Sequence, residues 1–208
     1  MIRPVLLLAL AACLPSAELV VRDLRVGLAT RPLDFDFDYS GDSTHRSGSD
    51  SFDASFGIEG GGRWSLARAG DAVGLVLGTD LLIDGWSYDG TDGLATTSLR
   101  GSIGAGWAVT DRVALTLEGG LQGGLSRLSL PSTDEAPSFS AKGFAYGYDL
   151  RLEAIWLATR RFGIAADAGW LISKHSLSGD ADVTLKQSGW FFGVTAVWRF
   201  TDAPPLLE

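Results

Sequence analysis

The two histidines of this sequence are its strongest candidates for acid–base chemistry, because each stands next to hydroxyl groups. His175 precedes Ser176, and His45 follows Asp42 and Ser43. A serine nucleophile, a histidine base and a carboxylate act together only when rigid elements hold them about 3 Å apart. The Ser, Gly and Asp residues around His45 are typical of a solvated loop, and His175 is predicted to lie at the base of another loop. The sequence therefore assigns no catalytic residue.

Three carboxylates, Asp34, Asp36 and Asp38, alternate with apolar residues and offer oxygen ligands of the kind that cations bind. They lack the glycine and the distal glutamate of a calcium loop, so an acidic strand extension is the preferred interpretation. Cys13 is the only cysteine, which excludes disulfides within the chain and zinc sites built on several thiolates. No metal and no cofactor is predicted.

Strands must position any functional side chain in this protein. Residues 189–200 show the strand pattern. Every second residue of this segment is apolar and mostly bulky, while the residues between them are mostly small or polar. Side chains alternate between the two faces of a strand, so the pattern predicts a strand with one apolar face. The apolar row consists of Trp190, Phe192, Val194, Ala196, Trp198 and Phe200.

The same alternation recurs in seven other segments, which makes eight strands. In the first of them the apolar phase changes at Pro32, where a β-bulge is expected to absorb one residue. These segments are 24–39, 52–66, 73–83, 99–109, 113–125, 144–156 and 162–172.

The connections between the segments alternate in length. Residues 69–71, 110–112 and 159–161 form short turns, whereas the other connections are longer and rich in Ser, Gly and Asp. Short turns at one end and long loops at the other indicate an up-and-down meander with both termini at the short-turn end. The long loops are predicted at 40–51, 87–94, 129–143 and 173–183.

The polarity of the two rows indicates what each face contacts. Bulky apolar side chains occupy one row, and glycine and charge dominate the other, which suits the narrow interior of an eight-stranded barrel. About eleven residues at roughly 3.3 Å each, tilted near 40°, span about 25 Å, the height of the apolar band of a membrane barrel. The sequence thus predicts an all-β fold, an eight-stranded antiparallel up-and-down transmembrane β-barrel. A soluble barrel or sandwich is the alternative.

The charged residues of the inner row form a predicted lumen network. Both signs occur in comparable number, so in a space too narrow for bulk water they are expected to pair and to plug the barrel. A gated small-ion pore is the alternative. The network consists of Arg25, Glu59, Arg63, Asp80, Arg100, Glu118, Asp149, Arg151, Glu153, Asp167 and Arg199.

The start of the chain indicates export. Residues 1–17 contain a positive Arg3, an apolar run and small residues before a possible cut after Ala17, as in a secretory signal. Residues 10–13 also resemble the lipobox of bacterial lipoproteins, which would leave Cys13 lipidated at the mature N-terminus. Both alternatives place the protein outside the cytoplasm.

The remainder of the 208-residue chain is assigned to one barrel, residues 18–200, and a short periplasmic tail, residues 201–208. The net charge of −8 argues against nucleic acid as a partner, since phosphate binding needs clustered Lys and Arg.

The export signal, the eight amphipathic strands, the alternating connections and the final aromatic strand resemble the small outer-membrane barrels of Gram-negative bacteria, of the OmpA, OmpX and opacity-protein kind. The resemblance covers about residues 19–200. It implies a bacterial outer-membrane location with periplasmic termini, and contacts with outer-membrane lipid and lipopolysaccharide. In that family the C-terminal strand is similar to a signal read by the barrel-assembly machinery. The resemblance implies that role for Trp190, Phe192, Gly193, Val194, Trp198 and Phe200, although the tail after Phe200 departs from the many barrels that end at the aromatic residue.

The resemblance identifies a fold and a compartment better than an activity. A structural or surface-interaction role is predicted, with an extracellular ligand as a partner of the long loops. Some barrels of this size are enzymes that act on lipid A, and lipid A deacylases pair a His with a Ser two positions later. Leu177 occupies that position after His175, so the motif fails. An enzyme acting on lipid A is the first alternative, and a narrow pore is the second.

Overall fold

The computed structural model describes residues 18–41, 44–51, 54–67, 73–88, 91–130 and 138–200, so the predicted signal and tail lie outside the described residues. Nearly all of the described chain is β-strand. The strands are β1 Glu18–Thr30, β2 Leu33–Gly41, β3 Thr44–Ser51, β4 Ala54–Ala67, β5 Val73–Tyr88, β6 Thr91–Thr110, β7 Val113–Leu130, β8 Phe139–Leu157, β9 Phe162–Gly179 and β10 Asp182–Arg199. Within these ranges no helix is long and apolar enough to cross a membrane.

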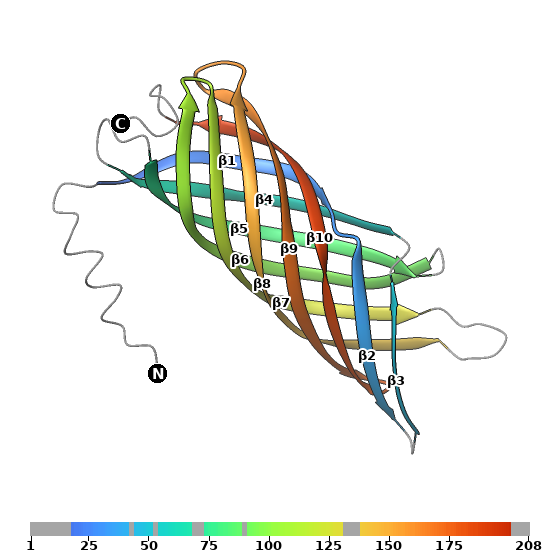
Figure 1. Cartoon of the computed structure of the whole chain (residues 1–208). Coiled ribbons are helices and arrows are strands. Elements are labelled where there is room, and N and C mark those ends of the chain that lie inside the picture. Colours follow the sequence, from blue (N-terminus) through green and yellow to red (C-terminus); the bar gives the residue numbers. More distant parts are fainter. Residues whose placement is uncertain are drawn as a thin grey trace, which may run out of the picture.

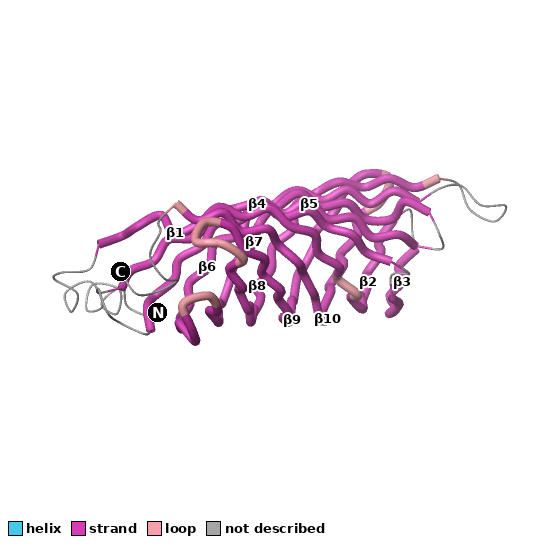
Figure 2. Tube along the Cα trace, turned by 90° about the horizontal axis from the view of Figure 1, so that it is seen from above, coloured by secondary structure: helices cyan, strands magenta, loops and turns pink. Residues whose placement is uncertain are grey.

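Eight of the strands close into a ring in the order β1-β4-β5-β6-β7-β8-β9-β10, and each is antiparallel to its neighbours (Figures 1 and 2). The ring is closed by β10 and β1, in a register that places Asp23 opposite Arg199 and Thr30 opposite Phe192. Figure 1 shows the start of β1 and the end of β10 at one end of the barrel, with β2 and β3 at the other. The predicted eight-stranded up-and-down barrel is confirmed.

β1 and β2 together form one interrupted strand along β10. The part of β10 at residues 192–199 pairs with β1, and the part at residues 182–189 pairs with β2. The interruption falls at Arg31 and Pro32, and Pro32 has no N–H to donate to a neighbouring strand. On its other side β2 pairs with β3. The hairpin of β2 and β3 therefore lengthens the wall beyond the closed ring.

The bulge predicted at Pro32 is wrong. Leu33 and Phe35 are buried, and Asp34 and Asp36 are exposed, with the same parity as the residues of β1. The pairing of β2 with β10 also continues without a register shift. The apolar residues therefore move from the outward row to the inward row because the surroundings of the strand change along the barrel. The strand keeps the same residue parity on each face.

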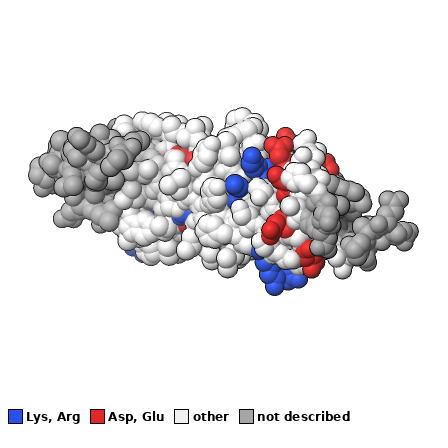
Figure 3. Space-filling model, turned by 90° about the horizontal axis from the view of Figure 1, so that it is seen from below, with Lys and Arg blue, Asp and Glu red and all other residues white. Residues whose placement is uncertain are grey.

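The outward face of the ring carries a continuous band of exposed apolar side chains, as predicted. Trp190 and Trp198, at the two ends of the band on β10, are each about half exposed, and Trp190 packs edge-on against Trp170 with ring centroids 5.4 Å apart. Figure 3 shows that the middle of one face of the barrel is mostly neutral, while Lys, Arg, Asp and Glu gather toward one end. A broad apolar surface edged by aromatic rings matches hydrocarbon between two wet interfaces. The band includes Leu28, Phe56, Leu99, Leu121, Leu125, Leu150, Leu152 and Val194.

Toward the end that carries β2 and β3, the two faces of the wall exchange polarity. Leu177, Val183 and Leu185 are buried inside, while Ser178 and Lys186 are exposed outside. Apolar inward and polar outward is the pattern of a barrel that stands in water. The barrel therefore has a zone fitted to lipid and, beyond it, a zone fitted to water.

Several connections predicted as long loops are strands in the structure. β3 occupies most of 40–51, only residues 180–181 separate β9 from β10, and β5 and β6 extend well into 87–94. The connection predicted at 129–143 is also shortened at both ends. These segments are rich in Ser, Gly, Asp and Lys because their outward alternates face water, and composition alone does not distinguish such strands from loops.

The short turns at the opposite end are closed by threonine hydroxyls. The Oγ1 atom of Thr110 accepts a hydrogen bond from the N–H of Val113 at 3.0 Å, and Thr159 Oγ1 accepts one from Phe162 N–H at 3.0 Å. The two predicted turns at these places are confirmed. The third, at 69–71, lies outside the described residues.

The outward and inward faces of β10 make a direct test of the assignment. Ala196 is exposed on the outer face, and Thr195 is buried inside, where its hydroxyl donates to Glu59 at 3.2 Å. Ala196→Arg should destabilise the folded barrel in a bilayer by about 2–4 kcal/mol, since it places a charge against hydrocarbon. Thr195→Ser keeps the hydroxyl and should fold like the parent. The readout is the folded fraction in lipid vesicles on an unheated gel, and equal yields for the two variants would overturn the assignment.

Candidate functional site

The interior of the ring holds a set of charged side chains shielded from solvent. All eleven lumen residues named from the sequence are at most 7% exposed, and they come from every strand of the ring. Within the described chain the buried charged set amounts to seven arginines and eight carboxylates. Arginine suits such a place because it stays protonated and offers several directed N–H donors. The residues that sequence analysis did not include are Arg22, Asp23, Arg31 and Asp84.

Three of these four residues could have been found by extending the alternation. Arg31 continues the inward row of β1, Asp84 continues that of β5, and Asp23 precedes the residue at which the first strand was expected to begin. Arg22 carries no such signal. It is buried because the register with β4 shifts between Val21 and Asp23, which places two successive residues inside.

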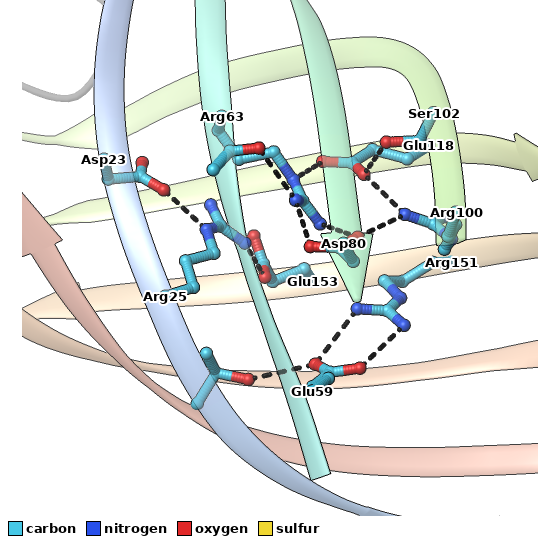
Figure 4. Close-up of polar contacts among 12 residues, drawn as sticks. Asp23, Arg25, Glu59, Arg63, Asp80, Arg100, Ser102, Glu118, Arg151 and Glu153 are labelled. Atoms are coloured by element: carbon cyan, nitrogen blue, oxygen red, sulfur yellow. Dashed lines mark hydrogen bonds and ion pairs between the residues drawn. The ribbon is translucent and has the colours of Figure 1, made fainter. Parts of the chain in front are cut away.

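The central group joins two arginines and three carboxylates from five consecutive ring strands. Figure 4 shows Arg63, Asp80, Arg100 and Glu118 of this group. Arg63 forms a two-pronged pair with Asp80, at 2.7 and 3.1 Å, and its Nε donates to Glu118 at 2.9 Å. Arg100 forms a similar pair with Asp149, at 2.8 and 2.6 Å. Its Nη1 also donates to Asp80 at 3.1 Å and to Glu118 at 3.4 Å. Asp80 and Glu118 are thus each shared by two guanidinium groups.

A second group lies around the middle of β1. Asp23 accepts from Arg22 at 2.7 Å and from Arg25 at 2.5 Å. Arg25 also pairs with Glu153, whose other oxygen accepts a hydrogen bond from the Thr116 hydroxyl at 3.1 Å. Arg25 therefore links the first strand of the ring to β8 across the interior, as Figure 4 shows.

A third group surrounds Glu59. Arg151 donates two hydrogen bonds to Glu59, at 3.2 and 3.1 Å, and its Nε lies 3.7 Å from Asp167. Arg31 pairs with Asp84 and lies 3.7 Å from Glu59. Removing one member of such a buried set leaves a charge without its partner, which costs far more free energy than the pair contributes.

Glycines on the inner wall make room for the guanidinium groups. A Cβ atom at Gly120 would lie 2.5 Å from Nε of Arg100, and one at Gly78 would lie 2.9 Å from Cδ of Arg63. Either substitution would push an arginine away from its carboxylates. The need for space in a narrow lumen therefore explains part of the abundance of glycine, 27 residues in this chain.

Apolar side chains close the interior on both sides of the network. Toward the end that carries β2 and β3 lies the larger apolar cluster, which includes Phe191. The Arg151 guanidinium lies 5.1 Å from the centre of the Phe191 ring. The side chains of Arg63 and Arg100 are 1% and 0% exposed, so they have almost no surface within reach of water. The cluster on the short-turn side consists of Ala114, Ile155, Leu157, Ala165 and Val197.

His175 lies inside the barrel beyond the apolar band, which ends on β9 at Ile172. Its Nδ1 is 2.8 Å from the Ser126 hydroxyl, and its Nε2 is 2.7 Å from Oε1 of Gln187. A neutral imidazole satisfies both neighbours with one donor and one acceptor. Ser176 faces outward, on the opposite side of the wall. His175 is thus part of the interior packing, and it lies within β9 and not at the base of a loop, where the sequence placed it.

The other residues considered for chemistry lie on the surface of the β2–β3 hairpin. His45 Nδ1 is 3.4 Å from Oδ1 of Asp38, and both side chains are more than half exposed. Asp34 and Asp36 are exposed on the same strand as Asp38, in agreement with an acidic strand extension. Among the described residues, no group of three or more His, Cys, Asp or Glu side chains is arranged to hold a metal ion.

The residues implied as an assembly signal lie on β10 and at its end. Gly193 faces the interior, where a Cβ atom would lie 2.5 Å from Oδ1 of Asp167. The others are about half exposed on the outer face, and their role in assembly stays a prediction. These outward residues are Trp190, Phe192, Val194, Trp198 and Phe200.

No protein-family model and no curated protein matches this chain. Among solved structures, neisserial surface protein A is 15% identical, with a TM-score of 0.40 and coverage of 83% of this chain and 95% of that one. The outer membrane protein OprG from Pseudomonas aeruginosa is 12% identical, with a TM-score of 0.45 and coverage of 86% and 96%. The outer membrane protease OmpT from Escherichia coli is 9% identical, with a TM-score of 0.40 and coverage of 89% and 99%. Similarity at this level assigns no activity, ligand or partner to this chain.

Arg100 offers a test of the central group. Arg100→Met should lower the free energy of unfolding by about 3–5 kcal/mol, because Asp149 loses its partner in a place that water does not reach. Adding Asp149→Leu removes the stranded carboxylate and should restore part of the loss. Urea unfolding of the parent, the single and the double variant in lipid vesicles measures both effects. A single variant that unfolds at the same urea concentration as the parent would show that the network is not buried as described.

Two adjacent glycines of β7 form a matched pair for the packing of the lumen. Gly120→Ala should cost about 1–3 kcal/mol, because the new methyl group would displace the Arg100 guanidinium. Gly119 faces outward, and a Cβ atom there meets nothing within 4 Å, so Gly119→Ala should not destabilise the barrel. The same unfolding assay compares them, and equal losses would contradict the packing argument.

Proposed function

We propose that the protein is an integral β-barrel of the bacterial outer membrane with a closed lumen. It acts as a structural or surface-interaction protein through the end that carries β2 and β3. The observation that supports this most strongly is the combination of an outward apolar band with an interior set of charges at most 7% exposed. The band anchors the protein, and the paired interior removes the lumen as a route for solutes.

Two features support the membrane location. Leu99, Leu121 and Leu125 are 67, 72 and 71% exposed, which is costly for a protein surrounded by water. The closed ring also satisfies the backbone hydrogen bonds of its strands internally, as a bilayer requires. The export signal expected at residues 1–17 agrees with an envelope protein, and the final aromatic strand agrees with recognition by the barrel-assembly machinery.

The closed lumen is favoured over a pore by the exposure of its charges. An ion pathway would leave its lining groups in contact with water, whereas Arg63, Arg100 and Glu118 have side chains no more than 1% exposed. Both oxygens of Asp80 and both of Glu118 are already bound by guanidinium groups, so a passing cation would have to displace arginine. The network therefore supports a plug.

The zone beyond the apolar band is the proposed contact surface. Since β1 begins and β10 ends at the short-turn end, periplasmic termini would place β2, β3 and the water-fitted zone outside the cell. This zone is built mainly of strands, so it presents a firm wall to a ligand or a neighbouring lipid headgroup.

The arrangement of His175 and Ser176 gives no support to an enzyme acting on lipid A. The imidazole of His175 faces the interior and is bonded to Gln187 and Ser126, while Ser176 faces outward from the same strand. A histidine base and a serine nucleophile must lie on one side of the wall to act on the same lipid.

The three functions give different results in two experiments. The purified barrel in a planar lipid bilayer should show no conductance steps, because its lumen is filled by paired charges. Expression in a Gram-negative host should leave the mass spectrum of lipid A unchanged. Regular conductance steps would show that the lumen is a pore and not plugged. A new lipid A mass would show that the protein is an enzyme acting on lipid A.

A further inference from the structure

We propose that a basic arc on the outer surface of the barrel binds the phosphate groups of an outer-leaflet glycolipid, that is, a lipopolysaccharide headgroup. The arc consists of Arg127 on β7, Lys142 on β8, Lys174 on β9 and Lys186 on β10, four adjacent strands of the ring. The inference rests on the proposed membrane location, and it gives the proposed function a lipid partner and a binding site.

The register places like charges directly opposite each other. Arg127 is the cross-strand partner of Lys142, and Lys174 is that of Lys186. Such pairs destabilise a sheet unless an anion lies between them. Among the described residues, no carboxylate comes within 4.0 Å of any of the four charges. Lys186 also has Asp36 as a cross-strand partner, whereas in the described part of the chain Arg127, Lys142 and Lys174 have no acidic cross-strand partner and are available for an external anion.

The arc lies at the border between the apolar band and the water-fitted zone. Lys174 and Lys186 each stand four residues from the packed pair Trp170 and Trp190, about 13 Å along the strand. Tyr146 is the direct cross-strand partner of Lys174. Aromatic rings mark the interface of a bilayer, so the cations beyond them stand at the depth of lipid headgroups. Figure 3 shows basic side chains at this border on one face.

The spacing of the two pairs favours a headgroup with two phosphates. In the register of β8 with β9, Lys174 lies opposite Tyr146, four residues from Lys142, which puts the nearest members of the two pairs, Lys142 and Lys174, about 14 Å apart. On the far side of Lys186, the cross-strand partner is Asp36, which repels a phosphate. The acidic strand thus bounds the site and confines it to β7–β10.

A hollow beside Arg127 gives the rest of the headgroup room. It has a volume of about 580 Å³, and its lining includes Gly85, Ala95 and Phe56. Gly85, Ala95 and Arg127 follow one another across the register of β5, β6 and β7, so two small residues leave the wall shallow next to the cation. A sugar or the start of an acyl chain fits there while the phosphates contact the arc.

The test compares two phosphorylation states of one lipid on the folded protein in detergent micelles. The probes are purified lipid A with two phosphates and the same lipid with both phosphates removed, and native mass spectrometry measures binding. The double variants R127Q/K142Q and K174Q/K186Q should each weaken binding of the bisphosphorylated lipid about tenfold or more. The control R112Q/R160Q removes two exposed charges at the short-turn end and should bind like the parent. Lipid without phosphates should bind the parent as weakly as the variants bind the intact lipid.

Three results would overturn the proposal. They are arc variants that bind like the parent, a control that loses as much affinity as they do, and displacement of lipid A by inorganic phosphate at an equal concentration. Each variant is first shown to be folded by its migration on an unheated gel, and the single variants R127Q and K186Q replace a double variant that does not fold. Failure of the membrane proposal is a separate result, because it would appear as loss of the protein from the outer-membrane fraction of cells.

Discussion

The structure depends on one constraint: charges enclosed where water does not reach must be neutralised by one another. An eight-stranded ring is too narrow to hold bulk water beside large side chains, so its inner row is filled either by apolar groups or by paired charges. Here arginine forks hold shared carboxylates in the middle, apolar clusters lie on both sides, and glycines such as Gly78 and Gly120 provide the space. The outward apolar band follows from the same geometry, because alternation sends the bulky residues to the opposite face.

The strands, their order and the inward face could be predicted from the sequence because the alternation has a fixed period of two and the polarity contrast is strong. The prediction failed where the polarity of the surroundings reversed. Beyond the band, Leu33 and Leu185 face inward and polar residues face outward. In the sequence this reversal resembles a change of strand phase at Pro32 and a polar loop at 173–183. The buried position of Arg22 depends on a local register shift, which leaves no mark in the residue pattern. Which carboxylate each arginine would contact depends on the cross-barrel geometry, which no linear pattern contains.

The two zones of the barrel have different proposed roles. In the proposed function, the lipid-fitted zone anchors the protein in the membrane, and its paired interior charges close the lumen to solutes. The water-fitted zone continues the same strands and lines the membrane border with cations from four of them, ending at the acidic strand β2. A wall of this kind is suited to holding lipid headgroups next to a firm surface, which is consistent with a structural role in the envelope.

The most direct test of the central claim is nuclear magnetic resonance of the barrel in lipid nanodiscs, with cross-relaxation measured from lipid acyl chains and from water. We expect acyl-chain contacts to Val194 and Leu150, and neither acyl-chain nor water contacts to the guanidinium protons of Arg63 and Arg100. Water contacts at both arginines, together with no acyl-chain contacts at Val194 and Leu150, would contradict the central claim, because the charged row would then be wet and the apolar row enclosed.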